Sequence, residues 1–170
     1  HDDNQLRRIL LPLTPEYISY FDARLGQDLL RTYRPQIEHL GPHRVKYRVD
    51  FDNLVIDEDV AAMCVSRPTN PTGNVLTDNE IVHLAELAAE HDIPLIIDNA
   101  KGAFPNIIFT DVKPFWNEHI ILTQSLSKIG LPGTRTGIVI AREEVIRWVS
   151  SMTSIVGLSN TNAGQAIMQP

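Results

Sequence analysis

Short apolar runs alternate with amphipathic stretches along the chain, a pattern typical of parallel strands joined by crossover helices. Apolar runs predict strands at residues 8–13, 62–66, 94–98, 120–123 and 136–141. Strict alternation of polar and apolar residues over 44–51 predicts a further strand with one exposed face. Before that strand we predict a polar helix or loop over residues 21–32. The sequence therefore predicts an α/β fold with a mostly parallel sheet.

Two helices are predicted from their start signals and apolar spacing. The segment 77–80 (TDNE) has the form of a capping box, and apolar residues follow it at helical spacing. This pattern predicts a helix over residues 78–91. A second helix is predicted over residues 142–151, where Glu143 and Arg147 stand four positions apart and can pair.

Composition and charge exclude several classes of protein. The chain has 170 residues, 43% of them hydrophobic, which is enough to bury a core. Its net charge of −6 and isoelectric point near 5.4 leave no basic surface for nucleic acid. No apolar stretch approaches the roughly 20 residues of a membrane-spanning helix, and the first residues do not resemble a signal peptide. We therefore expect a cytoplasmic protein that binds neither nucleic acid nor membranes.

The single cysteine and the histidines are expected to be structural. Cys64 lies in an apolar run, where a small buried side chain fits. The six histidines show no metal-ligand spacing, and none stands beside a serine or cysteine as in a catalytic triad. The sequence therefore predicts no metal site.

The candidate site lies at the carboxyl ends of the predicted strands, where ligands bind in open α/β sheets. Asn70 follows one strand in a loop stiffened by two prolines, and Asp98 ends another strand. A third strand leads into residues 125–137 (SLSKIGLPGTRTG), which hold hydroxyl groups, one lysine, one arginine and several glycines. Hydroxyls and a guanidinium bind phosphate oxygens, and glycines let the backbone approach closely. This segment predicts a site for an anionic ligand.

Each central residue of this site has two interpretations. Lys128 is either a solvent-exposed loop lysine or, if desolvated beside other cations, a nucleophile toward an aldehyde. Asp98 either caps the next element or pairs with a cation such as a protonated ring nitrogen. Asn70 either forms an Asx-type turn or donates its amide to a ligand oxygen. The residues alone leave these alternatives open.

The order of these segments resembles the fold type I pyridoxal-phosphate aminotransferases. The resemblance rests on Asn70-Pro71-Thr72-Gly73, then Asp98-Asn99-Ala100, then Ser125-Leu126-Ser127-Lys128 and Gly133-Thr134-Arg135-Thr136-Gly137. It implies the three-layer α/β/α large domain of that family, with a mostly parallel sheet, and pyridoxal 5'-phosphate as cofactor. It also implies that Lys128 bonds covalently to the cofactor, that Asp98 pairs with its ring nitrogen, and that Asn70 contacts its ring oxygen.

Further roles are implied by the same resemblance. Ser125, Ser127 and Arg135 would bind the cofactor phosphate, and Pro15-Glu16-Tyr17 resembles the family's proline-and-tyrosine turn after an early strand. The family moves amino groups between an amino acid and a 2-oxo acid and forms homodimers. From about residue 9 to 157, the chain looks most like a bacterial subgroup that acts on valine and pyruvate. A lyase of the same fold that breaks C–S bonds or eliminates a β-substituent is one alternative, and a non-catalytic ligand-sensing regulator is another.

Two features depart from the family pattern. Lys101 stands where the family has a tyrosine that contacts the ring oxygen, and the stretch 101–105 is slightly short. Either Lys101 takes over that contact, or loop residues are missing or altered there. Lys101 also rivals Lys128 for the covalent bond, although its position suits the ring oxygen better. The family's early glycine-rich phosphate loop, ring-stacking aromatic and late substrate-binding arginine are not found, so we expect residues 1–170 to be an internal portion of the large domain, without N-terminal and small-domain segments.

Overall fold

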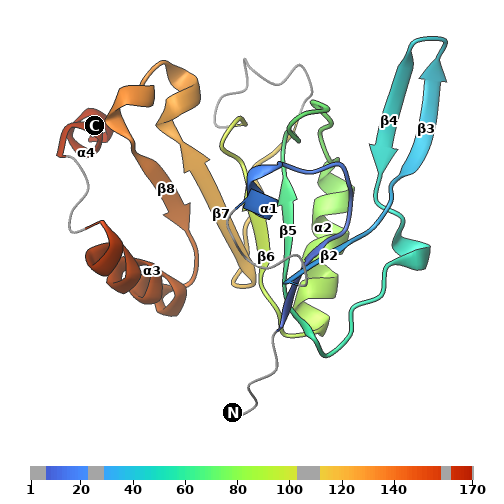
Figure 1. Ribbon diagram of the computed structural model, residues 1–170, viewed down its shortest axis with the longest axis horizontal. Helices are drawn as coiled ribbons and strands as arrows, with labels where there is room; N and C mark the ends of the chain where they lie inside the picture. The colour runs from blue at the N-terminus through green and yellow to red at the C-terminus, as the bar shows by residue number, and fades with distance from the viewer. Residues whose placement is uncertain (1–6, 23–28, 103–111, 158–161, 170) are drawn as a thin grey trace.

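A six-stranded sheet forms the centre of the fold (Figure 1). The computed structural model describes residues 7–22, 29–102, 112–157 and 162–169. The strands lie in the order β2-β1-β5-β6-β7-β8. Their bounds are Arg8–Leu11 for β1, Leu30–Thr32 for β2, Val60–Ser66 for β5, Leu95–Asp98 for β6, Ile120–Ser125 for β7 and Gly137–Ile140 for β8. All neighbouring pairs are parallel except β7 and β8, which confirms the predicted mostly parallel sheet.

The segment between the first strand and residue 44 differs from its prediction. The polar helix or loop predicted over 21–32 is wrong in part, because Leu30–Thr32 forms the edge strand β2; a short helix, α1, spans Ser19–Asp22. Residues 23–28 lie outside the described part of the chain. Gln36–Gly41, where no strand was predicted, forms β3 and pairs antiparallel with β4, Arg44–Arg48. β3 is exposed along its whole length, so its sequence has no buried apolar alternation to reveal it.

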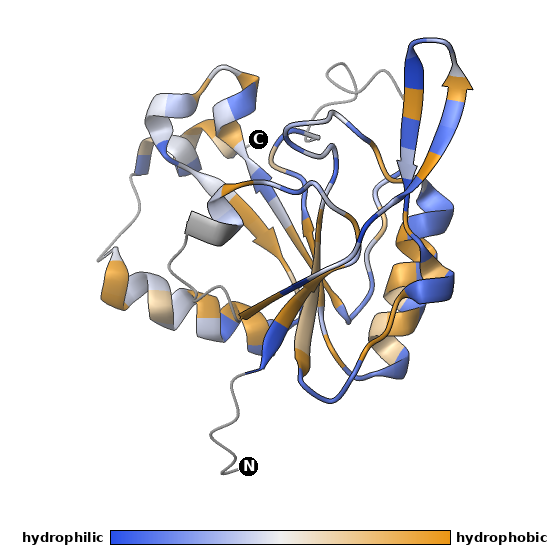
Figure 2. Ribbon diagram, turned by 45° about the vertical axis from the view of Figure 1, so that its right-hand side comes forward, coloured by the Kyte–Doolittle hydropathy of each residue, from blue (hydrophilic) through white to orange (hydrophobic). Residues whose placement is uncertain are grey.

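Helix α2, Asp78–Glu90, covers one face of the sheet and begins at the predicted capping box. Thr77 Oγ1 accepts a hydrogen bond from the Glu80 amide at 3.2 Å, and Glu80 Oε2 accepts one from the Thr77 amide at 2.8 Å. The apolar side of α2, orange in Figure 2, packs into the core with Met63, Leu95 and Ile120 of the strands. In-register pairing places these three buried side chains on the same face of the sheet.

Helix α3, Glu143–Val156, lies on the opposite face. Ile121 follows Ile120 in β7 and so points away from α2, and it lines a cavity together with Val145 and Trp148 of α3. The helix–sheet–helix arrangement confirms the predicted three-layer fold. Ile121 is only half-buried, whereas Ile120 is fully buried, so the described residues cover this second face incompletely. No helix within the described ranges is long and apolar enough to cross a membrane.

The carboxyl ends of β5, β6 and β7 meet at one edge of the sheet. Ser66 at the end of β5 pairs with Asp98 at the end of β6, and Asp98 pairs with Thr123 of β7. β7 leads into a 3-10 helix, η3, Leu126–Ile129, and a second one, η4, spans Pro132–Thr134. Figure 1 shows α1 at the same edge, after β1. Polar residues from four chain segments therefore converge there. A last helix, α4, spans Asn162–Met168 and was not predicted.

Candidate active site

Asp98 ends β6 with both carboxylate oxygens in hydrogen bonds. Oδ2 accepts from the Tyr20 hydroxyl at 2.7 Å, and Oδ1 accepts from the Ala100 amide at 3.0 Å. The second bond is the capping interaction that sequence reasoning gave as one of two alternatives. Among the described residues Asp98 forms no ion pair. Its carboxylate is therefore oriented by neutral donors.

The turn between β1 and α1 is bonded to the neighbouring strand β5 through Glu16. The buried Glu16 carboxylate accepts from the Ser66 amide at 2.8 Å, from the Ser66 hydroxyl, and from the Tyr17 amide at 3.1 Å. Burial raises the pKa of Glu16 above its usual value, and the bonds from Ser66 and Tyr17 oppose the rise. Ser66 ends β5, and its register partner Asp98 ends β6. The turn is therefore bonded to two neighbouring strand ends, to β5 through Glu16 and to β6 through Tyr20.

Arg67 holds the Asn70 loop closed. The buried Arg67 donates from Nε to the Leu76 carbonyl at 2.7 Å and from Nη2 to Asp78 Oδ1. Its amide donates to the Asp98 carbonyl at 2.9 Å. The Arg67 guanidinium lowers the pKa of Asp78 below its usual value. Both ends of the loop are thus tied together and to β6, which fixes the backbone around Asn70.

Lys128 lies in η3, directly after β7. Ser125 Oγ accepts from the Ser127 amide at 3.2 Å and so caps η3. Gly130 ends η3 with φ of 93°, a conformation that favours glycine. The exposed Lys128 side chain lines the same pocket as Asp98. The backbone on both sides of Lys128 is therefore held by the Ser125 cap and by the turn at Gly130, whereas its side chain is exposed in the pocket.

One pocket of about 180 Å³ brings four of the predicted site residues together: Asn70, Asp98, Lys101 and Lys128. The rest of its wall comes from the turn after β1, from β5 and from the end of β6: Tyr17, Ser66, Pro68 and Ala100. Three neighbouring strand ends thus supply the chemistry of the pocket, as expected for an open α/β sheet.

The three predicted phosphate ligands do not line this pocket. Ser125 and Ser127 are half-buried beside Lys128, and Ser125 Oγ caps η3. Arg135 follows η4 and is exposed, with Nη1 3.5 Å from the Pro132 carbonyl oxygen. All three belong to the segment that carries Lys128, whose ends are joined by the bond from the Leu126 amide to the Thr136 carbonyl at 3.1 Å. Their contact with a phosphate stays a prediction.

Two residues at the site were missed from the sequence. Tyr20 follows Tyr17 by three positions, the spacing of a single turn, and their rings meet edge to face at 5.7 Å between centroids. Arg67 directly follows a buried apolar strand, where an arginine needs several acceptors to be buried. The spacing of the two tyrosines and the position of Arg67 directly after an apolar strand were the sequence signals that could have indicated these two residues.

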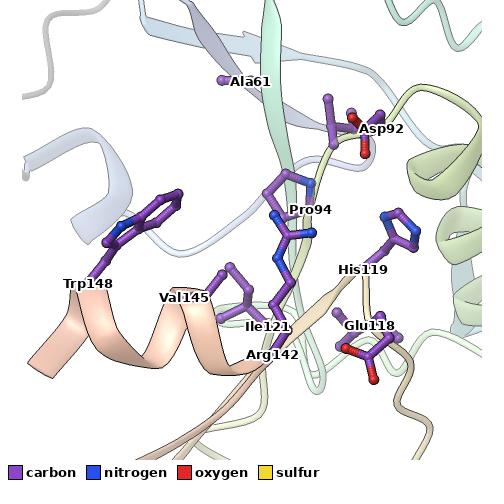
Figure 3. Close-up of a pocket in the computed structure, with 11 residues that line it drawn as sticks. Ala61, Asp92, Pro94, Glu118, His119, Ile121, Arg142, Val145 and Trp148 are labelled. Carbon is purple, nitrogen blue, oxygen red and sulfur yellow. The ribbon is translucent and has the colours of Figure 1, made fainter.

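A second cavity of about 270 Å³ lies at the other end of the sheet (Figure 3). Trp148 and Val145 border it from α3, and Pro94 and His119 border it from just before β6 and β7. None of the predicted site residues lines it. The described residues also contain no group of three or more potential metal ligands.

The donor set of the first pocket suits a small aromatic aldehyde with a ring nitrogen and a ring oxygen. The oriented carboxylate of Asp98 can pair with a protonated ring nitrogen. The Asn70 amide and a lysine ammonium can donate to a ring oxygen, and a primary amine can bond to an aldehyde carbon. The pocket offers two such amines, Lys101 and Lys128. The residues present therefore fit a cofactor of this kind.

Comparisons with known proteins agree on one family. A family model described as aminotransferase class I and II matches residues 33–169. The valine–pyruvate aminotransferase of Escherichia coli (strain K12) is 51% identical over 167 residues, which cover 98% of this chain and 40% of that protein. An aspartate aminotransferase of Pyrococcus abyssi is 29% identical over 148 residues, or 81% of this chain and 36% of that protein. The chain thus spans about two fifths of the length of these relatives.

A solved structure supports the same likeness. The crystal structure of valine-pyruvate aminotransferase from Salmonella typhimurium LT2 superimposes with a TM-score of 0.86 at 50% sequence identity. The match covers 95% of this chain and 41% of that structure. The fold of this chain is therefore the same as the fold of part of a solved structure with a similar sequence.

Proposed function

Because the chain belongs to the class I and II aminotransferase family, we propose that it is an internal portion of the large domain of a pyridoxal-phosphate-dependent aminotransferase. The observation that carries this proposal is the pocket that joins Asn70, Asp98 and Lys128 at three adjacent strand ends. The chain corresponds to 40% of its Escherichia coli relative, and the described residues cover one face of its sheet incompletely. Both features support a larger domain around residues 1–170.

The reaction we propose moves an amino group between an amino acid and a 2-oxo acid, with valine and pyruvate as the substrate pair. The support is the 51% identity to a valine–pyruvate aminotransferase over nearly the whole chain. Valine and pyruvate are small molecules that carry a carboxylate. The described pocket contains the residues proposed to bind the cofactor and to act at the substrate's α carbon. We therefore propose that the preference for the valine side chain comes from segments around this pocket.

Lys128 and Asp98 carry the central chemistry of this proposal. Bound pyridoxal phosphate supplies an electrophilic aldehyde and a ring that withdraws electrons from the substrate's α carbon. Lys128 Nζ would hold the cofactor at its aldehyde carbon, and as a free amine it could carry a proton to or from the substrate's α carbon. Asp98 keeps the ring nitrogen protonated, because its carboxylate already faces the pocket in a fixed orientation.

The remaining predicted residues orient the cofactor. Asn70 and Lys101 donate to the ring oxygen, with the Lys101 ammonium in the place of the family's tyrosine hydroxyl. Ser125, Ser127 and Arg135 bind the phosphate oxygens. Because they share a segment with Lys128, anchoring the phosphate also sets the distance between Lys128 Nζ and the reacting carbon.

The covalent assignment is tested with the full-length protein that contains this chain. Lys128→Ala should lose both the absorbance band of the bound cofactor and turnover of valine with pyruvate. Lys101→Ala and the exposed control Lys113→Ala should keep the covalent bond. Borohydride reduction followed by peptide mapping shows which lysine carries the cofactor. Attachment at Lys101, or a Lys128→Ala protein that keeps both signals, would refute the assignment.

Product analysis separates the proposed reaction from its alternatives. Formation of alanine from pyruvate, together with the 2-oxo acid of valine, supports amino transfer. Release of ammonia from an amino acid would instead support a lyase of the same fold. A full-length protein that binds the cofactor and turns over neither substrate would support a ligand-sensing regulator.

We also propose that the full-length protein is a cytoplasmic homodimer, as in the family that this chain resembles. Sedimentation velocity of the full-length protein tests the dimer: a species of twice the chain mass is expected. A stable monomer at micromolar concentration would contradict it.

A further inference from the structure

We propose that Tyr20 is a positioning residue for Asp98, an inference that rests on the proposed cofactor function. Tyr20 lies in α1, and its hydroxyl donates to Asp98 Oδ2 at 2.7 Å across 78 positions of sequence. The Ala100 amide donates to the other oxygen at 3.0 Å. With one donor on each oxygen, the plane of the carboxylate cannot rotate freely. Each oxygen keeps a second lone pair, one of which can accept the ring N–H of the cofactor.

Tyr20 is suited to this role because it remains a donor. Burial raises the pKa of Tyr20 well above its usual range, and the nearby Cys64 thiol and the Asp98 and Glu16 carboxyls add to the rise. The raised pKa keeps the phenol a hydrogen-bond donor at neutral pH. Within the described part of the chain, these same groups, from β5, β6 and the turn after β1, are the titratable groups that act on the Tyr20 hydroxyl.

The turn that carries Tyr20 is itself fixed. The Tyr20 amide donates to the Tyr17 carbonyl at 3.1 Å, and the two rings pack edge to face. Glu16, in the same turn, accepts from both the amide and the hydroxyl of Ser66. Ser66 and Asp98 are register partners on adjacent strands, so this one turn is hydrogen-bonded to the ends of both β5 and β6. The position of the Tyr20 hydroxyl is therefore set relative to the strand that presents Asp98.

The test uses the full-length protein and the variant Tyr20→Phe, with Tyr33→Phe as the matched control. The control likewise removes one phenol hydroxyl, which in Tyr33 donates to the Val55 backbone carbonyl away from the site. Tyr20→Phe should weaken pyridoxal phosphate binding by about tenfold, the typical worth of a hydrogen bond to a charged group. It should also shift the pH midpoint of the bound cofactor's absorbance, which a merely structural loss would not move. Tyr33→Phe should match the wild type in both.

A double-mutant cycle with Asp98→Asn shows whether Tyr20 acts through Asp98. If it does, Tyr20→Phe has little further effect on cofactor affinity once Asp98 is an amide. Tyr20→His, whose ring nitrogen can donate to Asp98, should restore part of the affinity. All values refer to the folded fraction measured by circular dichroism, so loss of fold is not mistaken for loss of binding.

The outcomes separate this inference from the function it rests on. A wild-type protein that binds cofactor, with Tyr20→Phe indistinguishable from Tyr33→Phe, overturns the role of Tyr20 alone. Fully additive effects of Tyr20→Phe and Asp98→Asn overturn it as well. A wild-type full-length protein that does not bind the cofactor overturns the proposed function and this inference with it.

Discussion

The Arg67 guanidinium and the Leu76 carbonyl oxygen, 2.7 Å apart, close the loop that carries Asn70. The same guanidinium donates to Asp78 and, at 3.3 Å, to the Lys113 carbonyl. One buried side chain therefore joins the loop after β5, the start of α2 and the segment before β7. Arg67 holds the wall of the pocket in place without lining it.

Arg67→Met keeps the length of the side chain and removes its donors. Because the Leu76 carbonyl then loses its partner, the free energy of unfolding of the full-length protein should fall by about 2–4 kcal/mol. Cofactor binding should weaken with it, since the backbone around Asn70 is no longer tied. Denaturant titration measures the loss. The control is Arg147→Met, on an exposed ion pair of α3, which should change stability by less than about 0.5 kcal/mol. Equal effects of the two variants would contradict the role of Arg67.

Gly102 sits where the chain next to Lys101 passes close to Arg67. A Cβ at Gly102 would overlap Asn99 Oδ1 and lie 2.6 Å from the Arg67 carbonyl oxygen. Gly102→Ala should therefore destabilise the full-length protein by about 1–3 kcal/mol and displace Lys101. Gly133→Ala is the matched control, because a Cβ there meets nothing within 4 Å. Thermal denaturation compares the two. A Gly102→Ala protein as stable as the control would show that the close approach is absent.

The sequence predicted the parts of this site that depend on neighbours in the chain. Asp98 ends an apolar strand and Lys128 lies just beyond one, so the rule for parallel sheets predicts that both lie at one edge of the sheet. The Tyr20–Asp98 bond joins positions 78 apart, and no local pattern encodes such a contact. The strand β2 is too short for a periodicity, and β3 has no buried face to produce one. The sequence therefore indicated which residue types form the site, but not which residues distant in the chain are in contact.

Glu16 should make stability depend on pH in a defined direction. In the unfolded chain its pKa is near the usual 4.5, and burial raises it in the folded state. Between those two values the folded protein binds more protons, so Glu16 lowers the free energy of unfolding as pH rises. Glu16→Gln cannot ionise. The stability of wild type minus that of Glu16→Gln should therefore decrease above pH 4.5 and level off above the folded pKa.

Denaturant titrations of the full-length protein at a series of pH values measure this difference. Glu86→Gln, on the exposed side of α2, is the control and should leave the pH profile unchanged. A stability difference that increases with pH would mean that Glu16 is stabilised as an anion, against the effect of its burial.

The exposed apolar face of α3 tests whether further chain packs against this helix. Trp148, Met152, Ile155 and Val156 are 59%, 61%, 77% and 79% exposed in residues 1–170. A continuous apolar stripe of this kind marks a surface that another element covers. If the proposed larger domain buries it, Met152→Asp should destabilise the full-length protein by about 2–4 kcal/mol, because a carboxylate would be placed in an apolar contact. Ser150→Asp, on the opposite side of the same helix, should change stability by about 0.5 kcal/mol or less. Equal, small effects of the two substitutions would mean that the stripe faces solvent and that residues 1–170 are not enclosed as proposed.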